Sequence, residues 1–132
     1  MKKATFKKIA FTAMVVLTMA LIGCRTAPVY NVTDTAVNVS GKATADDVKQ
    51  AIMSAGAGLG WQMKEVKPGH IVGSLFIRKH SAVVDIPYST KSYSITYKDS
   101  TELKYDGTNI HNNYNGWVQN LDRAIQARLS AL

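Results

Sequence analysis

The sequence predicts an α+β fold, an antiparallel sheet of three to four strands with two helices packed on one face. Residues 44–57 and 114–132 repeat apolar side chains at the spacing of amphipathic helices. Between them, residues 61–105 alternate apolar and polar side chains with a period of two, which is typical of half-buried antiparallel strands. Because the strands are grouped between the helices, we expect the order strand, helix, strands, helix.

The N-terminal segment, residues 1–23, has the composition of a secretory signal peptide. Four lysines lie between Lys2 and Lys8, and an uncharged, largely apolar run extends from Ile9 to Gly23. That run is shorter than the about 20 residues that a membrane-spanning helix needs. The alternative is an N-terminal membrane anchor that is never cleaved.

The four residues Leu21, Ile22, Gly23 and Cys24 resemble the lipobox of bacterial lipoproteins. In that class the cysteine thiol carries a diacylglyceryl group, the peptide is cut before the cysteine, and the new amine is acylated. The resemblance therefore implies three acyl chains on Cys24, and three chains hold a protein at a membrane permanently, whereas one binds only marginally. The alternative is an unmodified, unpaired cysteine of a secreted protein. That alternative does not explain why the only cysteine lies directly after the apolar run.

In bacterial lipoproteins, the residue after the cysteine indicates the membrane in which the protein stays. Lipoproteins with Asp at this position usually stay at the inner membrane, and this sequence has Arg25. The resemblance therefore implies a lipid anchor in the outer membrane, with the rest of the chain in the periplasm.

Removal of residues 1–23 would change the charge. The full sequence has a net charge of +7, and removing four of its 16 basic residues leaves twelve against nine acidic ones, or +3. No nucleic-acid partner is therefore predicted. We expect residues 24–43 to form the lipidated cysteine and a tether with a short strand at Val37 and Val39, and residues 44–132 to form a single α+β domain.

The first helix is predicted to begin after Thr44. Thr44 and Asp47 have the spacing of a capping box, in which each side chain accepts a hydrogen bond from the other residue's backbone N–H. Three glycines between Gly56 and Gly60 then weaken a helix, by about 1 kcal/mol each in its interior. We expect the regular helix to stop near Ala55 or Ala57.

The strands follow, separated by residues that favour turns, such as Pro68-Gly69 and Asp106-Gly107. The predicted strands are residues 61–67, 71–78, 81–88 and 92–98, with a further short strand at Leu103 and Tyr105. The last helix, residues 114–132, is predicted to pack an apolar face on the sheet, and the asparagines before it are expected to cap it.

A second resemblance covers roughly residues 44–125. The motifs "GW" at 60–61, "PG" at 68–69, "YSITY" at 93–97 and "NYNGWVQNLD" at 113–122 resemble those of small bacterial lipoproteins of unassigned function. The layout is also similar to the helix-grip domains in a lipoprotein subunit of the outer-membrane β-barrel assembly machine. A shared layout does not establish function, and neither likeness implies catalytic residues.

Little in the sequence indicates catalysis. The three histidines, His70, His80 and His111, lie far apart and lack any short metal-ligand spacing, so neither metal nor cofactor is expected. Adjacent residues of a strand point to opposite faces, so His80 and Ser81 would not assemble a hydrolytic triad with Asp85. We expect a protein that is not an enzyme.

Aromatic side chains are the other candidates for a site. Tyrosines and tryptophans make up most of the large side chains, and they either fill the core or line a groove that could bind a sugar or a peptide. Arg78, Lys79 and His80 form a small basic cluster, either a solvated strand end or a contact for anionic lipid or glycan. The candidate binding surface comprises Tyr93, Tyr97, Tyr114, Trp117 and Arg78.

The sequence therefore predicts a lipoprotein of the outer membrane whose periplasmic domain binds another envelope component. Its expected partners are the membrane, through Cys24, and an envelope protein, because tethering lets even a weak contact matter. The alternative is a module that binds a small ligand, a fragment of peptidoglycan or lipid.

Overall fold

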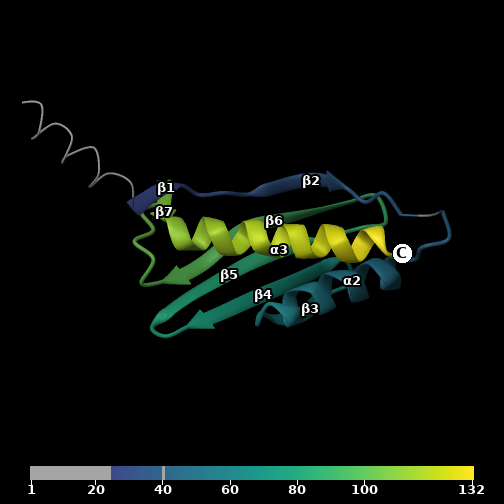
Figure 1. Ribbon diagram of the computed structural model, residues 1–132, viewed down its shortest axis with the longest axis horizontal. Helices are drawn as coiled ribbons and strands as arrows, with labels where there is room; N and C mark the ends of the chain where they lie inside the picture. Colours follow the sequence, from purple (N-terminus) through teal and green to yellow (C-terminus); the bar gives the residue numbers. More distant parts are fainter. Residues whose placement is uncertain (1–24, 40) are drawn as a thin grey trace, which may run out of the picture.

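A computed structural model describes residues 25–39 and 41–132 (Figure 1). The elements are β1 Thr26–Pro28, β2 Val32–Ala36, α2 Ala45–Gly58, β3 Gln62–Lys67, β4 His70–Ile77, β5 His80–Pro87, β6 Ser92–Thr101, β7 Asn109–His111 and α3 Asn112–Ser130. The α+β class is confirmed. Two strands precede the first helix, whereas the predicted order had only one.

Within the described residues the strands form two antiparallel sheets, one of five strands in the order β2-β6-β5-β4-β3 and a small one that pairs β1 with β7. The predicted three to four strands were therefore too few. A strand was expected at Val37 and Val39, but both strands before α2 lie earlier, and the one that joins the five-stranded sheet is β2, which pairs Val32 with Ile95 of β6. Leu103 and Tyr105 precede the short strand β7 instead of forming one.

Both helices lie over one face of the five-stranded sheet and contact each other (Figure 1). Alternate residues of the central strands point to this face, as Ile71, Leu75 and Val84 do, and are buried there. Burying one such Ile, Leu or Val side chain contributes about 1.5–3 kcal/mol. The helices add two rows at helical spacing, Val48, Ala51, Ile52 and Ala55 from α2 and Tyr114, Val118, Leu121, Ile125 and Leu129 from α3.

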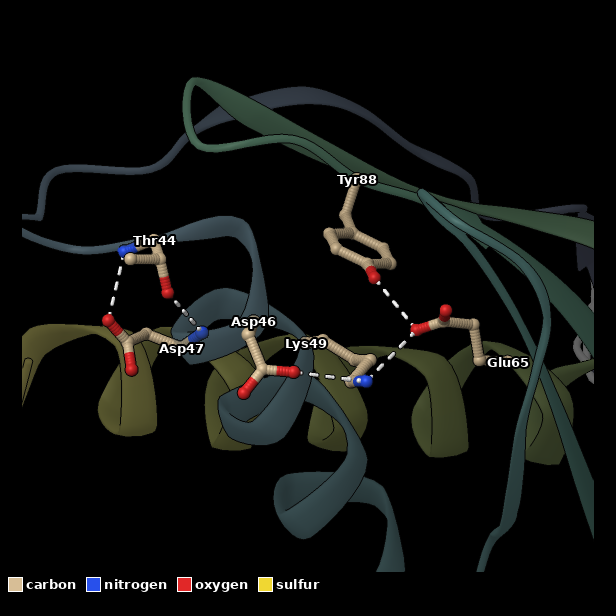
Figure 2. Close-up of polar contacts among 6 residues, drawn as sticks. All are labelled: Thr44, Asp46, Asp47, Lys49, Glu65 and Tyr88. Atoms are coloured by element: carbon tan, nitrogen blue, oxygen red, sulfur yellow. Dashed lines mark hydrogen bonds and ion pairs between the residues drawn. The ribbon is translucent and has the colours of Figure 1, made fainter.

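The predicted start of the first helix is confirmed. The Thr44 hydroxyl oxygen accepts a hydrogen bond from the Asp47 backbone N–H at 3.1 Å, and the Asp47 carboxylate accepts one from the Thr44 N–H at 2.9 Å (Figure 2). The helix extends to Gly58, one residue past the predicted end. Gly60, with a φ of 89°, then adopts a conformation that suits glycine.

Residues predicted as a tether lie against the domain. Thr26 pairs with His111 and Pro28 with Asn109, so β1 runs beside the segment that leads into α3. Asn115 of α3 holds the chain beyond β1, because its amide donates to the Pro28 carbonyl at 3.0 Å and accepts from the Tyr30 N–H at 2.9 Å. The described chain is thus fixed to the fold from Thr26 onward.

One end of the molecule gathers β1, β7 and the connections between β4 and β5 and between β6 and β7 (Figure 1). The C-terminus, the β5–β6 connection and the loop before α2 lie at the other end (Figure 1). The chain that precedes Arg25 therefore joins the domain at the first of these ends. Cys24 itself lies outside the described residues.

Candidate functional site

Two of the predicted binding residues belong to the core. Tyr93 is 1 % exposed and Tyr114 is fully buried, so neither ring presents a surface to a ligand. Burial raises the pKa of both hydroxyls, and in Tyr93 the hydrogen bond to Asp122 raises it further. The prediction that Tyr93 and Tyr114 belong to a binding surface is therefore corrected. These rings fill the space between the sheet and the helices, which was the other interpretation of the aromatic side chains.

Tyr97 and Trp117 are half-buried and pack against the core. The Tyr97 ring stacks on Tyr105 with centroids 4.0 Å apart and meets the edge of Tyr114 at 5.6 Å. Its hydroxyl lies 2.8 Å from the Ser100 hydroxyl. Since neighbours cover Tyr97, the more accessible ring of this cluster is Tyr105, which is 41 % exposed.

Arg78 is exposed, and the structure places it in a larger group of cations than the sequence indicated. We call Arg25, Arg78, Lys79 and Lys104 the basic end. Arg25 directly precedes β1, Arg78 and Lys79 form the turn between β4 and β5, and Lys104 lies between β6 and β7. None of the four forms an ion pair with another described residue.

An open pocket of about 550 Å³ lies at this end. It is lined by Arg25, Lys79, His80, Glu102, Lys104 and His111. Glu102 is the only acidic side chain in the lining. The pocket is therefore cationic overall, which suits an anionic group.

The two histidines of this pocket have different hydrogen-bond roles. His80 Nδ1 lies 2.9 Å from the carbonyl oxygen of Glu102, which can only accept, so this nitrogen carries the proton. His111 Nδ1 accepts from the Asn113 N–H at 3.1 Å, so His111 caps α3. The prediction that asparagines cap this helix was therefore wrong. Both rings are fixed by their Nδ1 contacts.

The backbone of the basic end is strained. Among the described residues other than glycine, φ is positive at four positions, and three of them, Arg78, Glu102 and Lys104, lie here. A left-handed conformation costs such residues roughly 1–2 kcal/mol each. Gly or Asn would fit these positions more easily, and strained backbone of this kind is concentrated at functional sites.

A second polar cluster joins α2 to the sheet (Figure 2). Lys49 lies 3.1 Å from Asp46 and 3.6 Å from Glu65, and the Tyr88 hydroxyl donates to Glu65 at 3.0 Å. The hydrogen bond with Asp46 raises the pKa of Lys49, and partial burial raises that of Tyr88. Lys49 thus bridges a carboxylate of its own helix and one of β3, so the cluster fastens α2 to the sheet.

A third cluster lies on the sheet face that the helices do not cover. His70 Nε2 is 2.7 Å from an Asp85 carboxylate oxygen, and Lys98 is 3.6 Å from the same oxygen. Asp85 is thus bound to His70, and His80 is bound to the Glu102 carbonyl, so these residues do not form a triad with Ser81. A hairpin that turns at Arg78-Lys79 places Asp85 opposite Val72 and diagonally across from His70, so its register could have indicated this contact.

No group of three or more His, Cys, Asp or Glu side chains within residues 25–39 and 41–132 could hold a metal ion. In the same residues, no helix is long and apolar enough to cross a membrane. A further depression, of about 430 Å³, is also open and lies beside Tyr97 and Tyr105.

The fold and the clusters define a small α+β domain with a cationic end. Comparisons with protein families, with curated proteins and with solved structures found no match. The resemblances drawn from sequence motifs therefore stay predictions.

Proposed function

We propose that the protein is a lipid-anchored protein of the outer membrane, not an enzyme, whose domain binds another envelope component, a protein. The lipobox motif at 21–24 supports the anchor. Arg25 directly follows Cys24, and β1 begins one residue later, so an anchored cysteine would hold the domain close to the bilayer. Anchoring would concentrate the domain near partners in the same membrane.

A protein is favoured as the partner by the uncovered face of the five-stranded sheet, and this observation carries the proposal. Val66 is 48 % exposed, and Val72 and Val83 are partly exposed, on strands whose opposite face is covered by helices. Exposed apolar side chains on an open sheet are a feature of protein interaction sites. A small-ligand module has less support, because Tyr93 and Tyr114 do not line a groove.

Two measurements test the proposal. The intact mass of the protein extracted from membranes reports the acyl chains on Cys24, and an unmodified thiol would end the anchoring hypothesis. A photoreactive residue at Val66, introduced in living cells, should cross-link one dominant envelope protein.

The controls are a photoreactive residue at Gln119, on the exposed side of α3, and Cys24→Ser as the untethered form. The cross-link should be absent at Gln119 and lost in Cys24→Ser. Equal labelling from both positions, or none from either, would contradict a protein partner at the sheet face.

A further inference from the structure

The basic end faces the membrane if Cys24 is the anchor. Only Arg25 separates Cys24 from β1, and two residues span at most about 7 Å. Thr26 is paired with His111, and Asn115 binds the Pro28 carbonyl, so the described chain offers no slack on the domain side. The end that holds β1 must therefore lie at the lipid headgroups.

This end also has the composition of a surface that binds membranes. Its four cations have no ion-pair partner among the described side chains. Beside them, Phe76, Ile77 and Tyr105 are 61 %, 38 % and 41 % exposed. Cations with neighbouring exposed apolar and aromatic side chains are typical of peripheral contact with anionic bilayers.

Acidic groups nearby lower the positive charge of this end without cancelling it, because three carboxylates, those of Asp99, Glu102 and Asp106, stand against four cations. Asp106 is engaged by its own turn, because its carboxylate accepts from the N–H groups of Thr108 and Asn109 at 2.9 and 2.7 Å. Asp99 accepts from the Ser100 N–H. Glu102 is the one carboxylate in the pocket lining.

We propose that the basic end, with the hairpin tip Phe76–Lys79, docks on the headgroup phosphates of anionic lipids and orients the domain on the bilayer. The open pocket between Arg25, Lys79 and Lys104 would receive one headgroup phosphate. This inference rests on the proposed anchor at Cys24. Within one Debye length, about 10 Å at 0.1 M salt, such charges act on the surface with little screening.

The test couples residues 24–132, which include all described elements, to a maleimide lipid through the Cys24 thiol. Vesicles contain phosphatidylcholine alone or with phosphatidylglycerol, and circular dichroism verifies that the coupled domain is folded. Hydrogen exchange is measured at the backbone amides of residues 76–80 and 102–105. Exchange should be slower on the vesicles with phosphatidylglycerol, and high salt should remove the difference.

The decisive variant is Lys79→Ser with Lys104→Ser. Its matched control is Lys42→Ser with Lys91→Ser, because Lys42 belongs to the loop before α2 and Lys91 to the β5–β6 connection. Both segments lie at the opposite end of the molecule (Figure 1). Each lysine near an anionic surface contributes about fivefold, so the first variant should dock roughly thirtyfold more weakly and lose the slowing. The control, with the same change in charge, should keep it.

Equal loss in both variants would overturn the proposal by showing attraction through net charge alone. Slowing on pure phosphatidylcholine with added inorganic phosphate would overturn it in favour of a free-anion site. Because the coupling supplies the tether chemically, an unlipidated Cys24 in cells would contradict the proposed function without changing this result.

Discussion

At the scale of single residues, the two buried tyrosines differ in what their hydroxyls contact. The Tyr93 hydroxyl donates to Asp122 at 2.5 Å, whereas the Tyr114 hydroxyl has no hydrogen-bond partner within the described part of the chain. A hydrogen bond to a charged group contributes about 1.5–3 kcal/mol, and an unsatisfied buried hydroxyl costs about 1–3 kcal/mol. We therefore expect Tyr93→Phe to lower the free energy of unfolding and Tyr114→Phe to leave it unchanged or raise it.

Urea denaturation of the two variants measures this difference. Both substitutions remove the same hydroxyl from the same kind of ring, so each is the control of the other. An equal loss of stability in both would show that the Tyr114 hydroxyl has a partner, such as a bound water.

The same hydroxyls predict a loss of stability in alkali. Burial raises the pKa of Tyr93 and of Tyr114 in the folded state, so the folded protein holds these protons more tightly than the unfolded chain. Their contribution is fully present below the unfolded pKa of about 10 and is lost as the pH rises further. The double variant Tyr93→Phe/Tyr114→Phe should lose less stability between neutral pH and pH values above 10, measured by urea midpoints. An unchanged slope would contradict this prediction.

At the scale of elements, α2 packs closely on β3 because Gly56 of α2 has no side chain where the two elements meet. A Cβ on Gly56 would lie 2.4 Å from Met63 Sδ and 2.7 Å from Met63 Cγ, and one on Gly73 would lie 3.1 Å from the same sulfur. Because Cγ lies close to the backbone of Met63, bending the tip of the side chain cannot relieve the clash. We expect Gly56→Ala to cost about 1–3 kcal/mol by overpacking, although alanine favours helices.

Gly58 in the same helix is the matched control. The nearest atom to its added Cβ is Arg128 Nη2 at 3.9 Å, an ordinary contact. Gly58→Ala should therefore be neutral or stabilising, by up to about 1 kcal/mol. Thermal unfolding compares the two, and Met63→Ala should recover much of the loss in Gly56→Ala. If both alanine substitutions destabilised the protein equally, the loss would come from their position near the end of the helix and not from a clash with Met63.

The periodic pattern of apolar residues predicted the long helices and strands, because each contains enough residues for the period to be visible. Both helices and β3 to β6 were located by it, to within a few residues. β1 and β7 have three residues each, too few for an alternation to be visible. β2 contains an irregularity between Val32 and Thr35, where Asp34 has a φ of 48°, so its pattern is broken. The regular alternation at Val37 and Val39 indicated the wrong segment for that reason.

At the scale of the whole molecule, the basic end could be predicted only in part. Arg78 and Lys79 are adjacent in sequence, and their cluster was visible there. Arg25 and Lys104 join it only because β1 pairs with β7 and because the segment after β6 turns back toward β7. Burial of Tyr93 and Tyr114 likewise follows from how the helices cover the sheet, and composition alone does not decide between the core and a groove.

The length of the tether gives the last prediction. If the basic end is oriented by its short connection to Cys24, a Gly/Ser linker of about ten residues inserted between Cys24 and Arg25 would let it move roughly 18 Å from the anchor. The effective concentration of the cations at the lipid surface then falls, steeply with linker length. In the vesicle experiment, we expect hydrogen exchange at residues 76–80 to return toward its rate on neutral lipid, while the thermal midpoint stays the same.

A rigid helical linker, which holds the domain away from the bilayer, should remove the slowing completely. Slowing that survives both linkers would show that the domain reaches the membrane through another face.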